Sequence, residues 1–272
     1  MDSIARLERK RKVLELLQTR GTLSLEALAE MLQISPITLR KDFRDLEKQR
    51  LINRLWGGVS LASPLSQGSI FEDKMLDSMP EKMAIAQTAL ALVKPKDVMG
   101  LGPGTTTYEF SKFLSEVPEI LVVTNSVKTA YLLVRLGVRI MMPGGFSRES
   151  SYSLTSPKTA EIFEGVHLDK LFLGADGVDV EGGITTLHQS EVDLLKTMIA
   201  VAGKVIVLAD YTKLGLRRFA SVCSLDDVDL LITDDKCSKA AVEHLRERGV
   251  RVEVASVQLG EKIHSMSNYK FR

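Results

Sequence analysis

A glycine-rich stretch from Gly100 to Thr107 carries residue types that can bind a small anion. It reads GLGPGTTT and lies between an apolar run and a segment with helical character. Glycines leave backbone N–H groups open to a ligand, threonine hydroxyls add donors, and a helix that begins here contributes its positive end. We predict a phosphate cradle formed by Gly104, Thr105, Thr106 and Thr107, with a plain structural turn as the alternative.

Two kinds of nucleotide site fit this stretch less well. A phosphate-binding loop of the nucleotide-hydrolase type would continue into Gly-Lys-Ser/Thr, and here the glycines are followed by threonines. A dinucleotide-binding loop needs an acidic residue at the end of the next strand to hold the ribose. That strand ends in Thr124, Asn125 and Ser126, so the sequence argues against a bound dinucleotide.

Polar clusters follow several other apolar runs of the chain. Any one of them is more commonly a turn or a helix cap, but all occupy the same kind of position, directly after a predicted strand. Hydroxyls, amides and lysines suit a phosphate, and carboxylates suit sugar hydroxyls, so together they predict a sugar-phosphate site. The predicted contacts beyond the glycine loop are Thr124, Asn125, Ser126, Gly144, Gly145, Asp176, Gly177, Glu191, Lys196, Asp210 and Lys213.

The elements that must position these residues form an alternating pattern. Apolar strands alternating with helices predict an α/β fold, a mostly parallel, doubly wound sheet covered on both faces. In such sheets, ligands bind beyond the carboxyl ends of the strands. The expected strands are 97–101, 119–124, 138–142, 169–175, 204–209, 229–233 and 250–255, and the expected helices are 81–93, 126–136, 191–202 and 238–249.

The first sixty residues have a different pattern, that of three short helices and a hairpin. Helices are expected over 6–20, 24–32 and 35–50, with Ser24 and Ser35 as N-caps and Pro36 at the first helical position. The third helix is basic on the face opposite its apolar stripe. A hairpin around Gly57 and Gly58 follows. This is the arrangement of a winged helix-turn-helix domain.

Basic and hydroxyl side chains on the third helix can reach phosphates and guanine edges in double-stranded DNA. The alternative is a solvated charged face on a small helical bundle. The three helices, the short turn and the basic face together favour DNA. The charge distribution agrees with this, because the first 60 residues carry 12 Lys and Arg against 8 Asp and Glu, and the remainder carries 24 against 27. The predicted DNA contacts are Ser35, Thr38, Arg40, Lys41, Arg44 and Arg54.

Composition shifts divide the chain into four parts. We predict a DNA-binding domain over 1–60, a linker rich in Ser and Pro over 61–80, an effector-binding α/β domain over 81–256 and a surface tail over 257–272. Within the linker, the segment IFEDK at 70–74 is a candidate for docking on the α/β domain.

Bulk composition narrows the class of protein further. The 272 residues are 44% hydrophobic and 26% charged, with a net charge of +1. Neither a membrane-spanning run nor a secretory signal is evident. Two cysteines and four scattered histidines suit a reducing cytoplasm and lack metal-ligand spacing. We therefore expect a cytoplasmic protein without a metal or another cofactor.

The segment ISPITLRKDFRDLEKQRLINRLWGG resembles the N-terminal signature of the DeoR family of bacterial transcriptional regulators. The segments GTTT, VVTNS, PGG, DKLFLGADGVD, GGITT and ADYTK occur in that family's order, so the resemblance extends over nearly the whole chain. The matching residues of the signature are Ile34, Ser35, Thr38, Leu39, Arg40, Lys41, Asp42, Leu46, Glu47, Gly57 and Gly58.

The resemblance implies a repressor of carbohydrate use whose C-terminal domain binds a phosphorylated sugar and thereby changes the affinity for operator DNA. It implies a sensor fold similar to ribose-5-phosphate isomerase, glucosamine-phosphate deaminase and CoA-transferase enzymes. Because a single DNA-binding domain makes few base contacts, we also expect a homo-oligomer, a dimer or a tetramer, that reads repeated half-sites. Two positions depart from the family's pattern. Gly102 stands where an aspartate is usual, and the turn near Thr155 lacks a glycine and is one residue longer.

A sugar-phosphate isomerase or deaminase is the alternative function. The segment GADGVD resembles an acidic motif of the isomerase, and such an enzyme needs a base beside a carbonyl. In the isomerase, a lysine precedes the next glycine run, whereas here Glu181 precedes Gly182 and Gly183. Because that cation is missing and a DNA-binding domain is attached, we predict that the chain is not an enzyme.

Overall fold

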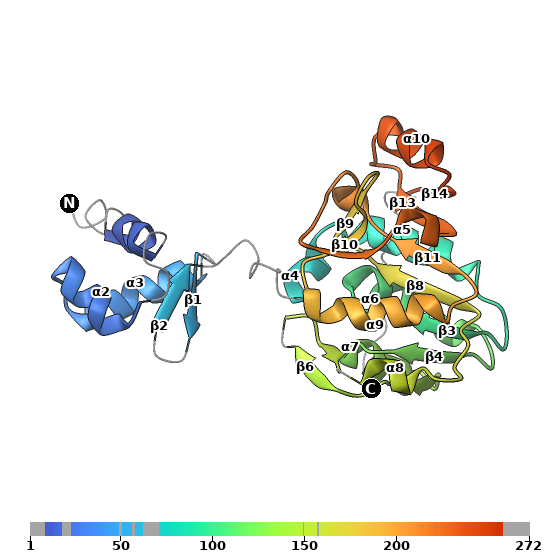
Figure 1. Cartoon of the computed structure of the whole chain (residues 1–272), viewed down its shortest axis with the longest axis horizontal. Coiled ribbons are helices and arrows are strands. Elements are labelled where there is room, and N and C mark those ends of the chain that lie inside the picture. Colours follow the sequence, from blue (N-terminus) through green and yellow to red (C-terminus); the bar gives the residue numbers. More distant parts are fainter. Residues whose placement is uncertain are drawn as a thin grey trace. The chain divides into compact units, whose positions relative to one another are not determined.

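The computed structural model describes residues 9–17, 23–48, 51–55, 58–61, 71–148, 150–156 and 158–257 (Figure 1). The chain divides into two compact units, residues 1–68 and residues 69–272. Each has a hydrophobic core of its own. In the described residues, no helix combines the length and the apolar character needed to cross a bilayer.

The first unit contains three helices and a hairpin, as predicted. Its elements are a helix over 9–17, α2 (Leu25–Leu32), α3 (Pro36–Lys48), β1 (Ile52–Leu55) and β2 (Gly58–Leu61). The Ser24 hydroxyl accepts the Ala27 N–H at 3.1 Å, and the Ser35 hydroxyl accepts the Thr38 N–H at 3.2 Å. Both serines therefore satisfy amides that a helix start leaves unpaired.

Helix α3 is held by its apolar stripe and by two acidic side chains. Leu39, Phe43 and Leu46 are buried in the core of the unit. Asp42, which is 1% exposed, accepts two hydrogen bonds from Arg9, at 2.5 and 3.1 Å, and Asp45 pairs with Lys10 at 2.7 Å. Asp42 and Asp45 thus face the first helix, whereas Arg40, Lys41 and Arg44 are exposed on the outer face.

The hairpin completes a winged helix-turn-helix fold. Strands β1 and β2 are antiparallel, with Leu55 opposite Gly58. Leu23, just before α2, exchanges two backbone hydrogen bonds with Val59, at 3.0 and 2.8 Å. The wing is therefore tied to the start of α2.

The second unit is built on a sheet of seven parallel strands, in the order β14-β13-β11-β8-β3-β4-β5. All seven strands expected from the sequence are in it, which confirms the predicted α/β fold. Their bounds are β3 (Val98–Leu101), β4 (Leu121–Thr124), β5 (Arg139–Met141), β8 (Lys170–Gly174), β11 (Val205–Leu208), β13 (Leu230–Asp234) and β14 (Val252–Ala255).

Helices cover both faces of this sheet. Helices α5 and α6 lie on one face and α9 on the other (Figure 1). Met99 and Phe172 belong to the apolar cluster of α5 and α6, and Leu171 and Val207 belong to the cluster of α9. Alternate residues of one strand thus serve two cores, which is why the central strands are largely apolar. The helices are α5 (Met79–Leu90), α6 (Thr105–Ser111), α7 (Val127–Arg135), α8 (Thr159–Ile162), α9 (Gln189–Ala200) and α10 (Lys239–Glu247), with short 3-10 turns at Leu114–Glu116 (η1), Tyr211–Lys213 (η2) and Leu225–Asp227 (η3).

The strand order reverses between β3 and β8. From β3, the chain proceeds outward through β4 and β5, then returns to β8 on the other side of β3 and continues outward through β11, β13 and β14. At such a point, the loops after neighbouring strands diverge to opposite faces and leave a crevice. The topology therefore places a binding site beyond the carboxyl ends of β3 and β8.

Two small antiparallel sheets were not predicted. Strands β9 (Gly177–Asp179), β10 (Gly183–Thr186) and β12 (Ala220–Cys223) form one, and β6 (Phe146–Arg148) and β7 (Ser153–Thr155) form the other. The three-residue strands carry too little periodicity to be recognised.

The expected linker over 61–80 is wrong at its C-terminal end. Residues 71–76 form helix α4 (Phe71–Leu76), and α5 begins at Met79. Phe71 is buried against Tyr108 and Tyr152 of the same unit, which explains why this segment is ordered and bears out the docking of IFEDK on the α/β domain. The predicted tail lies outside the described residues beyond Val257.

Candidate functional site

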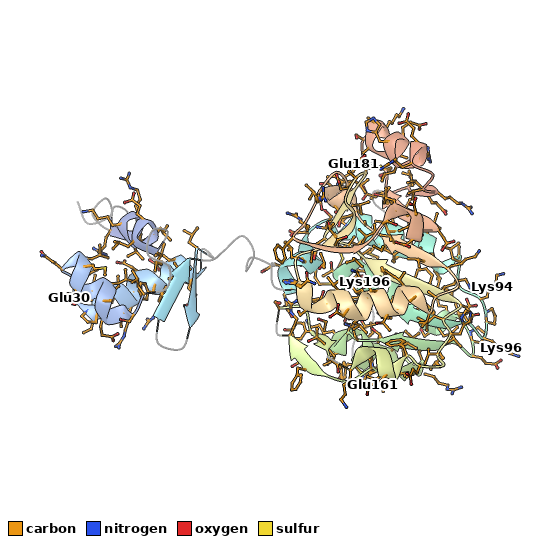
Figure 2. All side chains as sticks on the ribbon, viewed as in Figure 1. Glu30, Lys94, Lys96, Glu161, Glu181 and Lys196 are labelled. Carbon is orange, nitrogen blue, oxygen red and sulfur yellow. The ribbon has the colours of Figure 1, made fainter. Side chains whose placement is uncertain are left out.

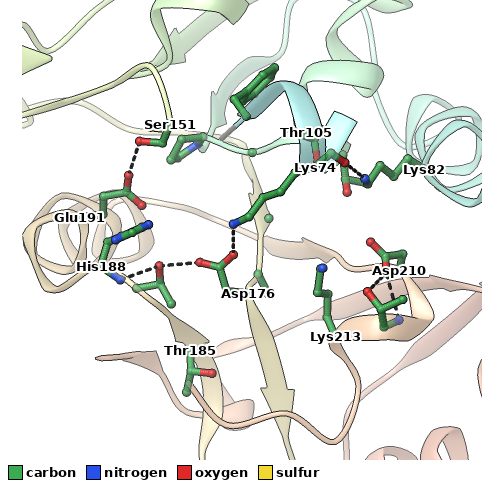
Figure 3. A pocket seen from close by; sticks show the side chains of 18 of the residues that line it. Lys74, Lys82, Thr105, Ser151, Asp176, Thr185, His188, Glu191, Asp210 and Lys213 are labelled. Carbon is green, nitrogen blue, oxygen red and sulfur yellow. Dashed lines mark hydrogen bonds and ion pairs between the residues drawn. The ribbon is translucent and has the colours of Figure 1, made fainter. Parts of the chain in front are cut away.

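A pocket of about 450 Å³ opens beyond the carboxyl ends of β3, β8 and β11, at the point where the strand order reverses (Figure 3). Both charged and hydroxyl side chains line it. The lining residues are Phe71, Lys74, Asp77, Ser78, Lys82, Pro103, Gly104, Thr105, Thr106, Ser150, Ser151, Gly174, Ala175, Asp176, Thr185, Thr186, His188, Glu191, Leu195, Asp210, Thr212, Lys213 and Val222.

The glycine loop forms one wall. Gly104 has a φ of 144°, a backbone conformation that residues other than glycine rarely adopt. Thr105 and Thr106 line the pocket directly after it. Thr107, also a predicted contact, does not line the pocket. Its side chain is buried, and its hydroxyl donates to the Gly104 carbonyl at 3.0 Å. A Cβ on Gly174 would lie 3.2 Å from the Pro103 oxygen, so the loops after β3 and β8 approach closely because glycine stands there.

Asp176, at the end of β8, is the best-connected carboxylate of the pocket. Its Oδ1 accepts from Lys74 Nζ at 2.9 Å, and its Oδ2 accepts from the Thr186 hydroxyl at 3.0 Å and the Leu187 N–H at 3.1 Å. Burial raises its pKa, but the Lys74 charge and these hydrogen bonds outweigh that effect and lower the pKa to about 2. Asp176 is therefore a firmly ionised hydrogen-bond acceptor.

Glu191 and His188 occupy the start of α9. Glu191 accepts hydrogen bonds from the hydroxyls of Ser151, at 3.0 Å, and Ser153, at 2.6 Å, and lies 3.6 Å from Arg148. Burial and then the charge of Arg148 lower the pKa of His188, against the pull of Glu191. A neutral imidazole and a carboxylate thus stand side by side (Figure 3), and both can bind ligand hydroxyls.

The two lysines on the far side of the pocket differ in their surroundings. Lys82 is 2% exposed, and its ammonium group donates to the carbonyls of Lys74 and Asp77. Burial lowers its pKa, although Asp210 opposes that effect. The ammonium group of Lys213 has no hydrogen-bond or ion-pair partner among the described residues. Its side chain points toward the space that Lys74 enters from the opposite side (Figure 3).

The structure brings seven of the predicted effector contacts together. They come from the loops after three adjacent strands and from the start of α9. These seven residues are Gly104, Thr105, Thr106, Asp176, Glu191, Asp210 and Lys213.

Thr124, Asn125 and Ser126 do not line the pocket. They are fully buried at the end of β4, where β7 covers them. The Asn125 side-chain amide donates to the Leu154 carbonyl at 3.0 Å, and Ser126 caps α7 by accepting the Thr129 N–H. These residues hold the β6–β7 hairpin and α7, which is their structural role.

Four further predicted contacts also lie elsewhere. Gly144 and Gly145, both with positive φ, lead into β6. Gly177 pairs within the small sheet, where a Cβ would meet the Leu216 oxygen at 2.3 Å. Lys196 is exposed on α9 (Figure 2). These four residues matched the pattern of glycine and polar residues after predicted strands, but the tertiary fold places them outside the pocket.

Sequence reasoning named IFEDK only as a segment that could dock on the α/β domain, and it did not predict that α4 and α5 line the pocket. Phe71, Lys74, Asp77 and Ser78 line the pocket from the segment expected to be a linker. The position of Lys82 in the sequence could have indicated that α5 contributes to the site. Lys82 lies on the same stripe of α5 as the buried Ile85, Ala86 and Ala89, and a lysine on an apolar stripe needs buried partners.

In the first unit, five of the six predicted DNA contacts lie on α3 or directly before it. Arg40, Lys41 and Arg44 are exposed on α3, and Ser35 and Thr38 share a 2.9 Å hydroxyl–hydroxyl hydrogen bond at its start. The backbone of Arg54 lies in β1, and its side chain lies outside the described residues.

Comparison with protein families assigns both units. Residues 9–64 match the DeoR-like helix-turn-helix domain, and residues 77–235 match the DeoR C terminal sensor domain. The chain belongs to the DeoR family. It is therefore a DNA-binding transcriptional regulator with a sensor domain, and not an enzyme.

Relatives of the DeoR-family chain match over nearly its full length. It is 34% identical to the HTH-type transcriptional regulator GlpR of Haloferax volcanii, over 90% of this chain and 96% of that protein. It is 31% identical to the HTH-type transcriptional repressor GlcR of Bacillus subtilis, over 93% and 98%. Among solved structures, ribose 5-phosphate isomerase A from Methanocaldococcus jannaschii is 21% identical over 48% of this chain and 52% of that one, with a TM-score of 0.37.

Proposed function

We propose that this DeoR-family protein is a cytoplasmic repressor of a carbohydrate-utilisation operon. In this proposal, α3 enters the major groove of operator DNA, and a phosphorylated sugar in the pocket lowers the affinity for that DNA. Relatives named as repressors, among them GlcR, support the direction of regulation.

The observation that carries the effector proposal is Lys213. A half-buried ammonium group without a partner among the described residues, facing a pocket, needs an anion. The hydroxyls of Thr105 and Thr106 line the same pocket. A lysine and hydroxyl donors together form a site for a phosphate monoester, because its oxygens accept several hydrogen bonds at once.

The carboxylates of the pocket favour a polyol on that phosphate. Asp176, Glu191 and Asp210 are acceptors and would repel a second anionic group. Sugar hydroxyls can donate to them, and the neutral His188 adds a further partner. A ligand with one phosphate and several hydroxyls therefore matches the pocket better than a nucleotide or a bisphosphate does.

The first unit supports the DNA side of the proposal. Asp42 and Asp45 on α3 are paired with the first helix, and Arg40, Lys41 and Arg44 remain exposed. One helix of this size contacts only a few base pairs, so we propose a homo-oligomer that reads repeated half-sites.

A thermal-shift screen tests the effector proposal. Glucose 6-phosphate, fructose 6-phosphate, fructose 1-phosphate, ribose 5-phosphate and glycerol 3-phosphate are compared with glucose, fructose and inorganic phosphate. We expect at least one phosphorylated compound to raise the Tm while its free sugar does not. No shift with any phosphorylated compound would refute the proposed effector class.

A pair of lysine variants locates the phosphate. Lys213→Ala removes the unpartnered ammonium, and we expect it to weaken binding of the active sugar phosphate by about 10- to 100-fold, the value of one charge-assisted hydrogen bond. Lys196→Ala removes the same charge from the exposed face of α9 and serves as the matched control. Equal affinities of the two variants, measured by calorimetry, would contradict the assigned role of Lys213.

A further inference from the structure

Helix α4 is both a wall of the pocket and the first element of the second unit in chain order. Residues 62–70 connect it to the DNA-binding unit, and Phe71, Lys74 and Asp77 line the pocket. Any rearrangement of α4 therefore changes the point at which the DNA-binding unit is attached.

The N-terminal end of α4 is held by contacts that a small rearrangement can break. The Phe71 N–H donates to the Ser150 carbonyl at 3.2 Å, and its ring packs edge-on against Tyr108 and Tyr152. Glu72 forms an ion pair with Lys128 outside the pocket. With only six residues, α4 has too few internal hydrogen bonds to be stable without these contacts.

The C-terminal end of α4 is anchored more firmly. The buried ammonium group of Lys82 donates to the carbonyls of Lys74 and Asp77. Those carbonyls belong to the last turn of α4 and the residue after it, which have no helical partners. This end is therefore the pivot about which the rest of α4 can move.

Inside the pocket, one ion pair ties α4 to the sheet. Lys74 Nζ lies 2.9 Å from Asp176 Oδ1, and the two side chains are 27% and 20% exposed. Asp176 Oδ2 keeps two donors of its own, from Thr186 and Leu187, whereas the hydrogen bonds of the described residues give Oδ1 only Lys74. A ligand hydroxyl can therefore replace Lys74 at Oδ1 without disturbing the rest of the Asp176 contacts.

We propose that the Lys74–Asp176 ion pair is a latch that opens only for a ligand carrying both an anionic group and a hydroxyl. The proposal rests on the proposed sugar-phosphate site. On binding, Lys74 moves from Asp176 to the phosphate, a sugar hydroxyl donates to Asp176 Oδ1, and α4 loosens about the end held by Lys82. The latch is thus a specificity filter and the start of the signal to the DNA-binding unit.

The specificity follows from the charge that is left unpaired when a ligand carries only one of the two groups. Inorganic phosphate can attract Lys74, but it leaves the Asp176 carboxylate without its cation. An unphosphorylated sugar can offer a hydroxyl to Asp176, but Lys74 then loses its anion. In a partly buried pair, removing one partner leaves an uncompensated charge. Only a ligand with both groups satisfies both residues after the exchange.

Amide hydrogen exchange of the full-length protein tests the latch. The peptide that covers residues 71–77 is followed with the sugar phosphate that gives the largest thermal shift, with its free sugar, and with inorganic phosphate. We expect this peptide to lose protection only with the sugar phosphate. In Lys74→Met, we expect protection to be lost without ligand and the ligand to have no further effect.

A matched variant separates the latch from the general stability of α4. Glu72→Gln removes an ion pair of the same helix outside the pocket, and its ligand response is expected to remain. Operator affinity provides a second measurement. We expect Lys74→Met to bind operator as weakly as the liganded wild type and to be insensitive to the sugar phosphate.

The outcomes distinguish the two proposals. A sugar phosphate that raises the Tm but leaves the exchange of residues 71–77 unchanged or slower overturns the latch, and the proposed effector class stands. A Lys74→Met variant whose operator binding still responds fully to the sugar phosphate also overturns the latch. The absence of any thermal shift across the phosphorylated panel overturns the effector class, and the latch with it.

Discussion

Asp176 shows how one residue links the stability of the fold to its site. Its pKa is lowered from 3.8 to about 2, although burial acts in the opposite direction. A carboxylate with a lowered folded-state pKa stabilises the protein above the unfolded pKa, and this contribution is lost as the pH falls through the folded pKa. The contribution at neutral pH is about 2 kcal/mol.

The pH dependence of unfolding tests this value. Between pH 6 and pH 3, we expect the wild type to lose about 1 kcal/mol more stability than Asp176→Asn, because about half of the Asp176 contribution has gone by pH 3. Urea unfolding of both proteins at the two pH values measures the difference. Parallel pH profiles would show that the Lys74 charge and the hydrogen bonds do not set the ionisation of Asp176.

At the scale of elements, the loops that shape the pocket depend on backbone positions that exclude a side chain. Gly183 begins β10, the strand that carries Thr185 and Thr186 into the pocket. Its φ is 66°, and a Cβ there would lie 2.2 Å from the Cys223 oxygen. Gly137 has a similar φ of 75°, but a Cβ would meet nothing within 4 Å.

This pair of glycines separates backbone strain from a steric clash. We expect Gly137→Ala to destabilise the protein by about 1 kcal/mol, the cost of a left-handed residue with a side chain. Gly183→Ala should cost about 1–3 kcal/mol more, because the neighbouring backbone must move. Chemical denaturation measures the loss of stability in both variants. Equal losses would mean that β12 moves away from residue 183 without an energetic penalty, and would contradict the predicted steric clash.

The seven parallel strands were predictable because each lies within a mostly apolar run of five or more residues, in regular alternation with segments of helical pattern. The rule that sites lie at strand ends also placed Thr105, Asp176 and Lys213 correctly in one pocket. The same rule placed Asn125 there wrongly. The β6–β7 hairpin covers the end of β4, and its three-residue strands have no periodicity that sequence reasoning could detect.

Helix α4 was missed for a related reason. Six residues after a Ser- and Pro-rich stretch show no helical period of their own, and the segment is ordered by contacts of Phe71 with Tyr108 and Tyr152, which are distant in sequence. Tertiary packing, and not local propensity, fixes this part of the site.

At the scale of the whole molecule, the charge on α3 should control affinity for DNA and leave effector binding unchanged. Arg44→Ala is expected to weaken binding to a DNA duplex selected from a random pool. A phosphate contact of Arg44 would also lower the slope of log affinity against log salt concentration by about 1. Lys158→Ala removes a charge from an exposed site of the second unit, where its side chain is 73% exposed, and is the control. Unchanged DNA affinity of Arg44→Ala, measured by fluorescence anisotropy over a salt series, would exclude this face of α3 from the interface.

The two units must also affect each other reciprocally if the pocket regulates DNA binding. When the sugar phosphate lowers operator affinity by a given factor, thermodynamic linkage requires the operator to lower sugar-phosphate affinity by the same factor, in the range of about 5 to 150. Calorimetric titration of the sugar phosphate into the full-length protein, with and without the selected duplex, measures this factor directly. In Lys74→Met, both factors should fall to about 1, since the latch no longer distinguishes the two states. Coupling that persists in this variant would mean that the signal leaves the pocket by a route other than α4.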